Sequence, residues 1–317
     1  MLIIGFSLSC PTFSASSAGY VAYQKGKQSY DSGDYSKAMK FYQKAAKEGF
    51  IRGLSGIGTL YFLGKGVSQD YSRAFKYFHK AADQGEASAE YSLGYLYEKG
   101  QGVNQNYKEA LMWFLKAAAQ GNANAEANIG YLHENGFGVP QNRQEAMKWY
   151  QLAATHGDTF SENLIGESHY YGTGLSQDFD EAMYWSQKAA KQGDASAARN
   201  IGLQYQYGQG VSKDYHKAMY WYQKGITEEN GKAENNIGFL YNKGLGVYQD
   251  FEEAMKWYRK AAAKGDSAAE CNIGVSYEMG NGVTRNYHEA IFWYKKAATD
   301  GDNIAPKLLE NLNQKLN

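Results

Sequence analysis

Residues 87–122 read ASAEYSLGYLYEKGQGVNQNYKEALMWFLKAAAQGN, and the pattern of this stretch occurs seven times without a gap between Ile51 and Asp302. We number each copy from position 1 to position 36, with Ile51 as position 1 of copy 1. A fixed period of about 20 to 50 residues is typical of a solenoid, in which each unit buries its apolar face against its neighbours. No linker interrupts the period, so we expect one elongated body and not two globular domains.

Glycine stands at positions 8, 14 and 16 of every copy. In copy 2, Ala89, Leu93 and Leu96 are spaced by three or four residues, which predicts an apolar stripe along a first helix, here called helix A. Gly100 is expected to end helix A, and Gly102 belongs to a turn whose backbone angles disfavour side chains. The pattern predicts no strands, so the fold class is all-α.

A second helix, helix B, has the same start signal in every copy. Position 20 holds an N-cap residue: Asp70, Asn106, Asn142, Asp178, Asp214, Asp250 and Asn286. In five copies a glutamate three residues later predicts a capping box: Glu109, Glu145, Glu181, Glu253 and Glu289. Position 24 is alanine, and we expect the position-8 glycine of helix A to lie opposite it. A glycine inside a helix costs about 1 kcal/mol relative to alanine, so close packing must compensate.

These residues resemble the Sel-one-like repeat (SLR), a relative of the tetratricopeptide repeat (TPR) with a longer turn between its two helices. The resemblance rests on the phrase G-x-x-Y-x-x-G-x-G-V, which runs from Gly94 to Val103 in copy 2, and covers residues 51–302. It implies a right-handed α-α superhelical solenoid of antiparallel helix pairs. It also implies that the outer stripe of helix A lines a concave groove for an extended peptide or a partner helix.

The chain continues beyond the seven copies on both sides. Residues 19–50 resemble a TPR-like helix pair without the long turn, because Ser32-Gly33-Asp34-Tyr35 stands in place of Gly-x-Gly-Val. Residues 303–317 are expected to form a capping helix over the exposed end of the array. Five apolar residues share one face of this helix: Ile304, Leu308, Leu309, Leu312 and Leu316.

Residues 1–18 combine an apolar stretch, Leu2 to Leu8, with a tract of small residues that includes Ser16 and Ala18. This composition suits a signal peptide, so we expect a periplasmic or secreted protein, although the usual basic start is missing. The alternatives are a disordered leader or a misassigned start on a cytoplasmic protein. No other stretch approaches the roughly 20 apolar residues of a transmembrane helix.

Charge and cysteine content argue against several classes. The 33 basic and 33 acidic residues cancel, so no net field attracts nucleic acid or an anionic membrane. Recognition of RNA by a helical-repeat code is disfavoured for the same reason. The cysteines are Cys10 and Cys271, one in the leader and one in the array, so we expect no structural disulfide.

We expect no catalytic, cofactor-binding or metal-binding residue. The six histidines lack His-Glu-x-x-His spacing, and the chain has no P-loop and no Gly-x-Ser-x-Gly elbow. We assign the aspartates and glutamates to helix caps and solvated faces, so no carboxylate pair stands out as acid and base. The resemblance leaves one alternative open, a cell-envelope enzyme or a protein that interacts with peptidoglycan or β-lactams. The paired cysteines of those relatives are missing here, which weakens that alternative.

Aromatic residues at fixed positions are expected in the core. All six tryptophans stand at position 27, and a stacked ladder of them could bind a glycan, but aromatic residues at helical spacing are usually core. Position 11 is tyrosine in five copies, while His133 and His169 replace it in the other two. We interpret these histidines as replacements for tyrosine and not as metal ligands.

The candidate binding residues lie on the outer stripe of helix A, at positions 2, 5, 6, 9, 12 and 13. Position 6 is asparagine in four copies, whose amides can bond a peptide backbone or, alternatively, a neighbouring copy or water: Asn128, Asn200, Asn236 and Asn272. Aromatic and basic candidates share the stripe: Tyr95, Tyr131, Phe160, Phe239, Arg199 and Lys232. We interpret the chain as a non-enzymatic scaffold or adaptor that binds a protein or peptide partner in this groove.

Copy 5 departs from the pattern at the end of helix B. Gly225 and Ile226 replace the usual Ala-Ala pair, and Glu229 replaces the terminal glycine. We predict a local bend of the array near Thr227 to Gly231.

Overall fold

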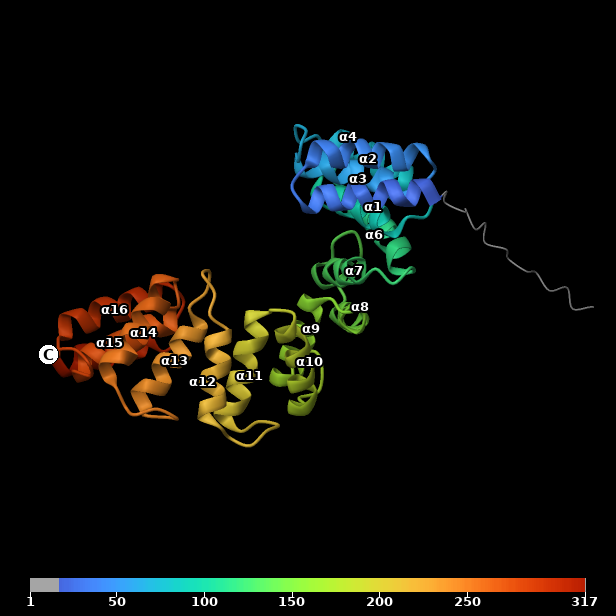
Figure 1. Cartoon of the computed structure of the whole chain (residues 1–317). Coiled ribbons are helices and arrows are strands. Elements are labelled where there is room, and N and C mark those ends of the chain that lie inside the picture. Colours follow the sequence, from blue (N-terminus) through green and yellow to red (C-terminus); the bar gives the residue numbers. More distant parts are fainter. Residues whose placement is uncertain (1–16, 317) are drawn as a thin grey trace, which may run out of the picture. The chain divides into compact units, whose positions relative to one another are not determined.

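The structure is all-helical, as the sequence predicts. The computed structural model describes residues 17–316, and among them it contains seventeen α-helices and no strand (Figure 1). The A helices are α1 (Ser17–Asp31), α3 (Arg52–Leu63), α5 (Ala87–Lys99), α7 (Ala123–Asn135), α9 (Thr159–Tyr171), α11 (Ala195–Tyr207), α13 (Lys232–Lys243) and α15 (Ser267–Met279). The B helices are α2 (Tyr35–Lys47), α4 (Tyr71–Ala82), α6 (Tyr107–Ala118), α8 (Arg143–Thr155), α10 (Phe179–Lys191), α12 (Tyr215–Lys224), α14 (Phe251–Ala263) and α16 (Tyr287–Thr299). A final helix, α17 (Ala305–Leu316), follows them.

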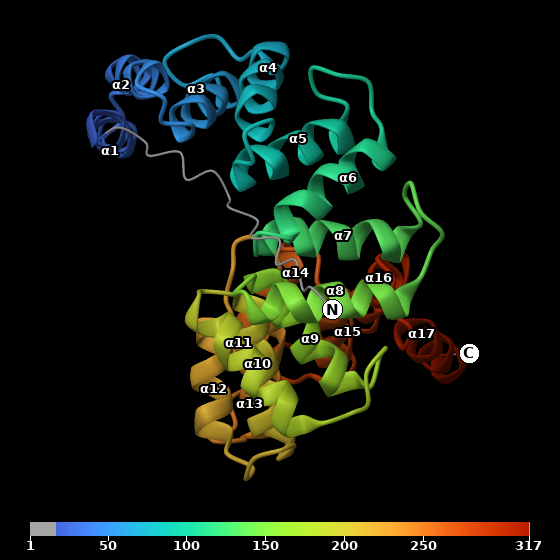
Figure 2. The same cartoon turned by 90° about the vertical axis from the view of Figure 1, so that its right-hand side faces the viewer.

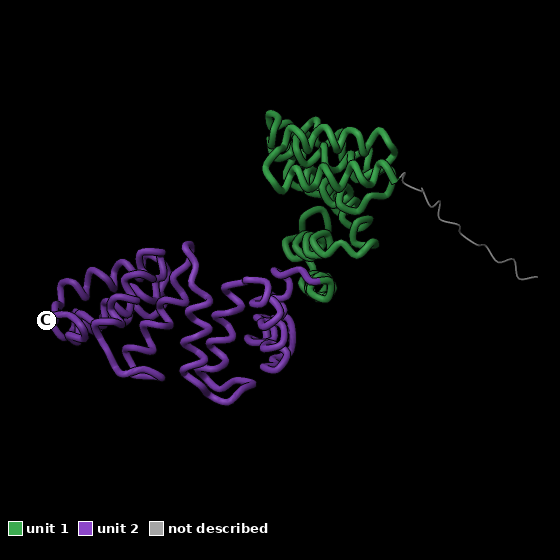
Figure 3. Tube along the Cα trace, in the orientation of Figure 1, with its two compact units in different colours: residues 1–156 green, residues 157–317 purple. Residues whose placement is uncertain are grey.

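The helices form two compact units, which divide after residue 156 (Figure 3). Unit 1 contains α1 to α8, which succeed one another in chain order (Figure 2). Unit 2 contains α9 to α17, and within each unit every helix packs against the next one along the chain. The predicted signal peptide lies outside the described residues, except for Ser17 and Ala18, which begin α1.

Helix A ends at the position-14 glycine, as the sequence predicts. Gly100 closes α5 in the left-handed backbone region, with φ of 67°. Two residues later, Gly102 also has a positive φ, and a Cβ atom there would lie 2.5 Å from the carbonyl of Tyr71. Glycine at position 16 is therefore required for two reasons: the backbone angle disfavours a side chain, and the preceding helix B leaves no room for one. Within each unit, the long turn of a copy thus contacts the helix B that precedes it.

All seven predicted N-caps of helix B are confirmed. Asp70, for example, accepts a hydrogen bond from the backbone N–H of Arg73 at 2.9 Å. Only one half of the predicted capping box is confirmed: the glutamate N–H donates to the N-cap side chain in all five copies. The return bond to the glutamate side chain is wrong, because the backbone N–H of each N-cap residue donates to the position-11 carbonyl of helix A, at 2.8 to 3.0 Å. Helix A ends just beyond that carbonyl, so its last turn lacks intrahelical donors and takes this one. The glutamate side chain at position 23 can then bond another group; Glu145, for example, forms an ion pair with Lys148 at 2.9 Å.

Helix A has caps of its own, which the sequence reasoning missed. The residue at position 36 accepts a hydrogen bond from the third backbone N–H of the helix A that follows: Glu86, Asn122, Asp158, Asp194 and Asp266. Asp302 likewise accepts from the N–H of Ala305, the first residue of α17. The acidic residue or asparagine before these helices was the signal present in the sequence. The residue at position 36 therefore caps the first helix of the next copy.

The position-8 glycines face the aromatic rings at position 28, one helical turn from the position-24 alanines that they were predicted to oppose. A Cβ atom on Gly94 would lie 2.5 Å from the ring of Phe114 in the same copy. Position 28 carries this ring in six copies, and copy 4 has Ser186 there instead. The predicted approach to the position-24 alanine is seen in copies 4 and 6, where the added Cβ atom would lie 3.4 Å from the carbonyl oxygen of Ala182 and 3.2 Å from that of Ala254. The glycine makes room for a buried ring between the two helices.

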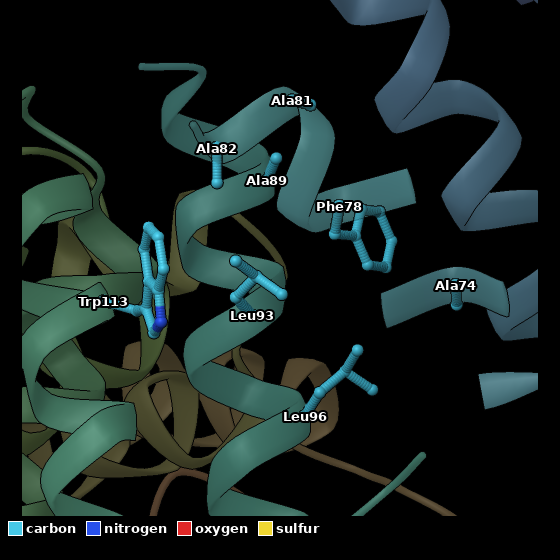
Figure 4. Packing of buried hydrophobic residues seen from close by; sticks show 8 residues of the cluster. All are labelled: Ala74, Phe78, Ala81, Ala82, Ala89, Leu93, Leu96 and Trp113. Atoms are coloured by element: carbon cyan, nitrogen blue, oxygen red, sulfur yellow. The ribbon is translucent and has the colours of Figure 1, made fainter. Parts of the chain in front are cut away.

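The core is a series of clusters that join consecutive copies. Figure 4 shows one of them, in which Phe78 from α4 and Leu93 from α5 pack with Trp113 from α6. Trp113 is buried, and the other five tryptophans are half-buried; three of these, Trp149, Trp257 and Trp293, pack at the edges of such clusters. The tryptophans therefore contribute to contacts between copies.

Helix α17 covers the last copy. Ala305 and Leu312 are fully buried against α16, and Leu308 and Leu309 pack beside them. Ile304, which the pattern placed on the apolar face, precedes the helix and is 64% exposed. The contact of α17 is thus narrower than the five apolar residues suggest.

Copy 5 has a shortened helix B. Helix α12 ends at Lys224 after 10 residues, whereas the other B helices of the array have 12 or 13. Residues 225–231 are not helical. This shortening agrees with the position of the predicted bend, and the bend itself stays a prediction.

Candidate partner-binding surface

The outer stripe of the A helices in unit 1 contains an apolar hollow of about 320 Å³. Leu63 lines its rim and is 43% exposed, although it is a large apolar side chain. Phe62 and Tyr95 meet edge to face across the hollow, with ring centres 5.9 Å apart. The remaining lining residues are Thr59, Phe78, Tyr91 and Ser92. Adjacent A helices, α3 and α5, therefore enclose a space of the size that an aromatic or branched side chain fills.

A second hollow of about 470 Å³ lies beside the first, between α1 and α3. Thr59 lines both hollows, so they follow one another along the same stripe. Charged groups line the second hollow, among them Lys27, Asp31 and Arg52. The surface of unit 1 thus changes from polar to apolar along the A helices.

The predicted asparagines have different surroundings. Asn200 is buried and donates to Glu167 of the preceding copy at 3.0 Å, and Asn272 donates to Asn235 of the preceding copy at 2.9 Å. These two amides hold neighbouring copies together, which was the alternative weighed against peptide binding. Asn128 and Asn236 are half-buried on the same stripe, and the Nδ2 atom of Asn236 has no hydrogen-bond acceptor among the described residues.

The predicted aromatic residues also differ in exposure. Phe160 is 61% exposed and Tyr131 is 41% exposed, so both present apolar surface on their helices. Phe239 is half-buried and packs against the core of unit 2. Two further tyrosines at position 13 in unit 2 are exposed: Tyr171, which the sequence also places among the groove aromatics, and Tyr207, which was not singled out.

The two basic candidates lie on adjacent A helices of unit 2. Arg199 on α11 is half-buried, and its Nε atom is buried without an acceptor among the described residues. Lys232 begins α13 and is exposed.

Five glutamates at position 4 of helix A are buried, which contradicts the assignment of all acidic residues to caps and solvated faces. They are each at most 5% exposed: Glu90, Glu126, Glu162, Glu234 and Glu270. Each bonds a residue near the end of helix B in its own copy: Gln120, His156, Gln192 with Lys188, Lys264 and Lys296 respectively. Burial raises the pKa of Glu90 and Glu270, because the charged form loses its hydration.

The signal for these glutamates was present in the sequence. Glu90 lies three residues before Leu93 and four before Gly94, which places it on the apolar side of helix A. A buried carboxylate needs a partner, and position 34 supplies one in four of the five copies. The contacts lie inside single copies, so they position the two helices and offer no open acid for chemistry.

Polar residues at position 12 are also partly used inside the fold. Glu134 accepts a hydrogen bond from the hydroxyl of Tyr150 at 2.9 Å, and Glu278 accepts one from Tyr294 at the same distance. Burial raises the pKa of Tyr294, so this hydroxyl keeps its proton and remains a donor. These carboxylates are therefore engaged with the core rings and are not fully available to a ligand.

Several features bear on other functions. Residues 17–316 contain no group of three or more His, Cys, Asp or Glu side chains placed to hold a metal ion. Over the same range, no helix combines the length and apolar character needed to cross a bilayer. Cys271 is buried, and burial raises the pKa of its thiol to about 12.

Comparison with known proteins supports the repeat architecture. A family model described as the Sel1 repeat matches eight segments of the chain: residues 15–50, 52–86, 87–122, 123–158, 159–194, 195–230, 231–266 and 267–302. Segment 15–50 includes the helix pair α1 and α2, which the sequence reasoning compared to a TPR. A search of curated proteins found no match.

Two solved structures are similar over most of the chain. The first is c5321, a protective antigen present in uropathogenic Escherichia coli strains that displays an SLR fold. It is 30% identical, with a TM-score of 0.67 over 93% of this chain and 72% of that one. The second is a Sel1 repeat protein from Oxalobacter formigenes, 28% identical, with a TM-score of 0.61 over 93% of this chain and 86% of that one.

Proposed function

Because the chain belongs to the Sel1 repeat family, we propose that it is a non-enzymatic scaffold that binds a polypeptide partner along the outer stripe of its A helices. Sel1 and TPR-like repeat proteins generally mediate protein–protein interactions. The observation that carries the proposal for this chain is the apolar hollow between α3 and α5.

The hollow has the properties of an anchoring site. It joins an exposed leucine, Leu63, to the half-buried rings of Phe62 and Tyr95. Buried aromatic and aliphatic anchors contribute most of the affinity in many protein interfaces, and polar surroundings keep water out. The ammonium group of Lys99 lies 5.6 Å from the ring centre of Tyr95 and supplies part of that polar rim. We therefore place one apolar side chain of the partner here.

A matched pair of leucines tests this placement. Leu63 on α3 is 43% exposed, and Leu115 on α6, a B helix, is 42% exposed in the same unit. Leu63→Asp should weaken partner capture by about tenfold or more, because a charge enters an apolar anchor site. Leu115→Asp should leave capture unchanged. The measurement is affinity-purified partner recovered from the source organism, with circular dichroism to confirm equal helix content.

Equal capture by the two variants and the parent chain would contradict the proposed surface. A loss of capture in Leu115→Asp alone would move the binding surface to the B helices.

The absence of catalysis is the second part of the proposal. Proteins of this family are generally scaffolds and not enzymes. The buried glutamates support this view, since each one is bonded to a neighbour within its own copy. Hydrolysis of a chromogenic β-lactam by the purified chain would contradict it and favour the alternative cell-envelope role.

We extend the proposal to export of the protein. The apolar stretch Leu2 to Leu8 and the small residues Ser16 and Ala18 support it. Cleavage after Ala18 would make Gly19 the first residue, which intact-mass measurement of protein from the source organism can detect. A chain that retains Met1 in a cytoplasmic fraction would show that export does not occur.

A further inference from the structure

Arg199 on α11 and Lys232 and Asn236 on α13 have hydrogen-bond donors without an acceptor, although the Nη1 atom of Arg199 makes one long hydrogen bond, to Asn200 at 3.4 Å. The Nε atom of Arg199 and the Nδ2 atom of Asn236 are both buried, and neither has a hydrogen-bond partner among residues 17–316. Lys232, four residues before Asn236, is exposed. Within the same described range, neither Arg199 nor Lys232 has a carboxylate oxygen within the 4.0 Å of an ion pair. Buried donors are nearly always satisfied in folded proteins, so a local set of unsatisfied ones points to a missing acceptor.

The missing acceptor results from a break in the bonding between copies. In the pairs α9–α11 and α13–α15, the position-6 amide donates to position 5 or 9 of the preceding copy, as Asn272 does to Asn235. In α11 these two positions hold Arg199 and Leu203, which offer no side-chain acceptor. Asn236 therefore stands where its equivalents donate, but the preceding copy presents another donor.

The nearby carboxylates are already engaged. Burial raises the pKa of Asp266, while the positive charges of Arg199 and Lys232 oppose that rise, so both cations lie near this carboxyl group. Asp266 caps α15 by accepting from the N–H of Ala269 at 2.7 Å. One carboxylate oxygen of Glu234 pairs with Lys264, and the other is buried without a partner among the described residues. Neither carboxylate is placed within bonding distance of Arg199 or Lys232, so the cluster keeps unused donor capacity.

We propose that Arg199, Lys232 and Asn236 form a subsite for the carboxylate of an aspartate or glutamate side chain on the bound polypeptide; this inference rests on the proposed function. A guanidinium fork binds a carboxylate through two parallel hydrogen bonds, the amide adds a third donor and the ammonium adds charge. Arg199, Lys232 and Lys243 are the only cationic residues at the outer-stripe positions of α11, α13 and α15. A polyanion such as a nucleic acid needs a run of cations, whereas one acidic side chain needs only this cluster.

The test begins with peptides selected from a random phage-displayed library against the full chain. The retained peptides should share an aspartate or glutamate at one position. Each peptide is then synthesised with an acetylated N-terminus and an amidated C-terminus, together with a version in which Asn or Gln replaces the acidic residue. Fluorescence anisotropy gives the dissociation constants.

Arg199→Asn is the informative variant. It should raise the dissociation constant of the acidic peptide by about tenfold or more, as expected for loss of hydrogen bonds to a charged group. The dissociation constant of the neutral version should change by less than about twofold. Lys243→Asn is the matched control, because Lys243 is an exposed cation on the same stripe of α13. It should change binding of the acidic peptide by less than about twofold. An equal effect of the two variants would indicate general charge attraction and overturn the subsite.

The same variant separates binding from folding. Arg199→Asn gives copy 5 the same residue at position 5 as copies 4 and 6, which have Asn163 and Asn235. The new amide oxygen provides Asn236 with an acceptor. The thermal midpoint of Arg199→Asn should therefore equal or exceed that of the parent chain. A lower midpoint would show that Arg199 is a structural partner inside the fold, and the subsite would be rejected.

The outcomes distinguish this inference from the proposed function. If the full chain retains no peptide, the proposed function fails and the subsite fails with it. If peptides are retained without a shared acidic residue, or if Arg199→Asn weakens acidic and neutral versions equally, only the subsite is overturned.

Discussion

The smallest determinant of this fold is the pairing of a glycine with a ring. In six of the seven copies, the glycine at position 8 and the aromatic residue at position 28 occupy one space between helix A and helix B. Phe114 is fully buried, and its ring fills the volume that a side chain on Gly94 would need. Glycine lowers the stability of the helix, but burial of the large ring contributes more free energy than the glycine costs.

Gly94→Ala should destabilise the chain. A Cβ atom would lie 2.5 Å from the Phe114 ring, and such overpacking costs about 1 to 3 kcal/mol. This cost is larger than the roughly 1 kcal/mol that alanine gains over glycine within a helix. The measurement is the thermal midpoint followed by circular dichroism, which should fall.

Gly166→Ala is the matched control at the same position of copy 4. The nearest atom to its added Cβ is the hydroxyl oxygen of Ser186, at 2.9 Å, and that small side chain can rotate away. We expect a smaller fall of the midpoint than for Gly94→Ala. Equal falls would show that the ring does not determine the effect.

Individual residues also show where sequence reasoning succeeds. The N-caps of helix B were predicted correctly because capping is local, requiring only a short polar side chain two or three residues before its donor. The return bond of the capping box failed because the carbonyl that replaces the glutamate belongs to position 11, across the long turn. The buried glutamates were missed because their partners lie 26 or 30 residues further along the chain, beyond any local pattern.

At the scale of the helices, five of the seven copies join helix A to helix B at both ends of the pair. The turn end is held by the hydrogen bond from the helix B cap to helix A, for example Asn106 to Tyr97 at 2.9 Å. The opposite end is held in five copies by the position-4 glutamate, for example Glu126 with His156 at 2.8 Å. Copy 5 has Ala198 at position 4 and Glu228 at position 34, so it lacks the second connection, and its helix B is also the shortest.

Deletion of residues 305–317 should loosen the last copy first. Helix α17 covers the buried ring of Tyr294 and brings Lys315 to Glu278 at 2.7 Å. In a repeat array each copy is stabilised mainly by its neighbours, so the loss should decline with distance from the deleted end. Hydrogen exchange measured by mass spectrometry should show faster exchange in α15 and α16 than in α9 and α10.

Leu312→Ala provides a milder form of the same perturbation. This leucine is fully buried, and removal of such a side chain costs about 2 to 5 kcal/mol. Its effect should also concentrate in α16. Uniform acceleration of exchange across all copies would contradict nearest-neighbour stabilisation.

At the scale of the whole chain, regularity predicts architecture better than it predicts the binding site. The period alone was enough for the all-helical class and for the family, because every copy repeats the same local signals. The hollow in unit 1 was only partly foreseen through Tyr95, since Phe62 and Leu63 come from the copy before it. The period does not give the offset between neighbouring A helices, and that offset decides which side chains share a space. Asn200 and Asn272 were chosen as binding candidates from their shared position in the period, yet their amides bond the preceding copy.

The location of the helix A caps has a consequence for how such a chain can change length during evolution. Asn122 ends copy 2 but caps the first helix of copy 3, whereas Glu126 and His156 connect within copy 3. Loss or duplication of a whole number of periods by unequal recombination keeps every cap in front of a helix, wherever in the period the exchange occurs. Repeat number can therefore vary in single genetic events, while the stripe residues of each copy diverge independently.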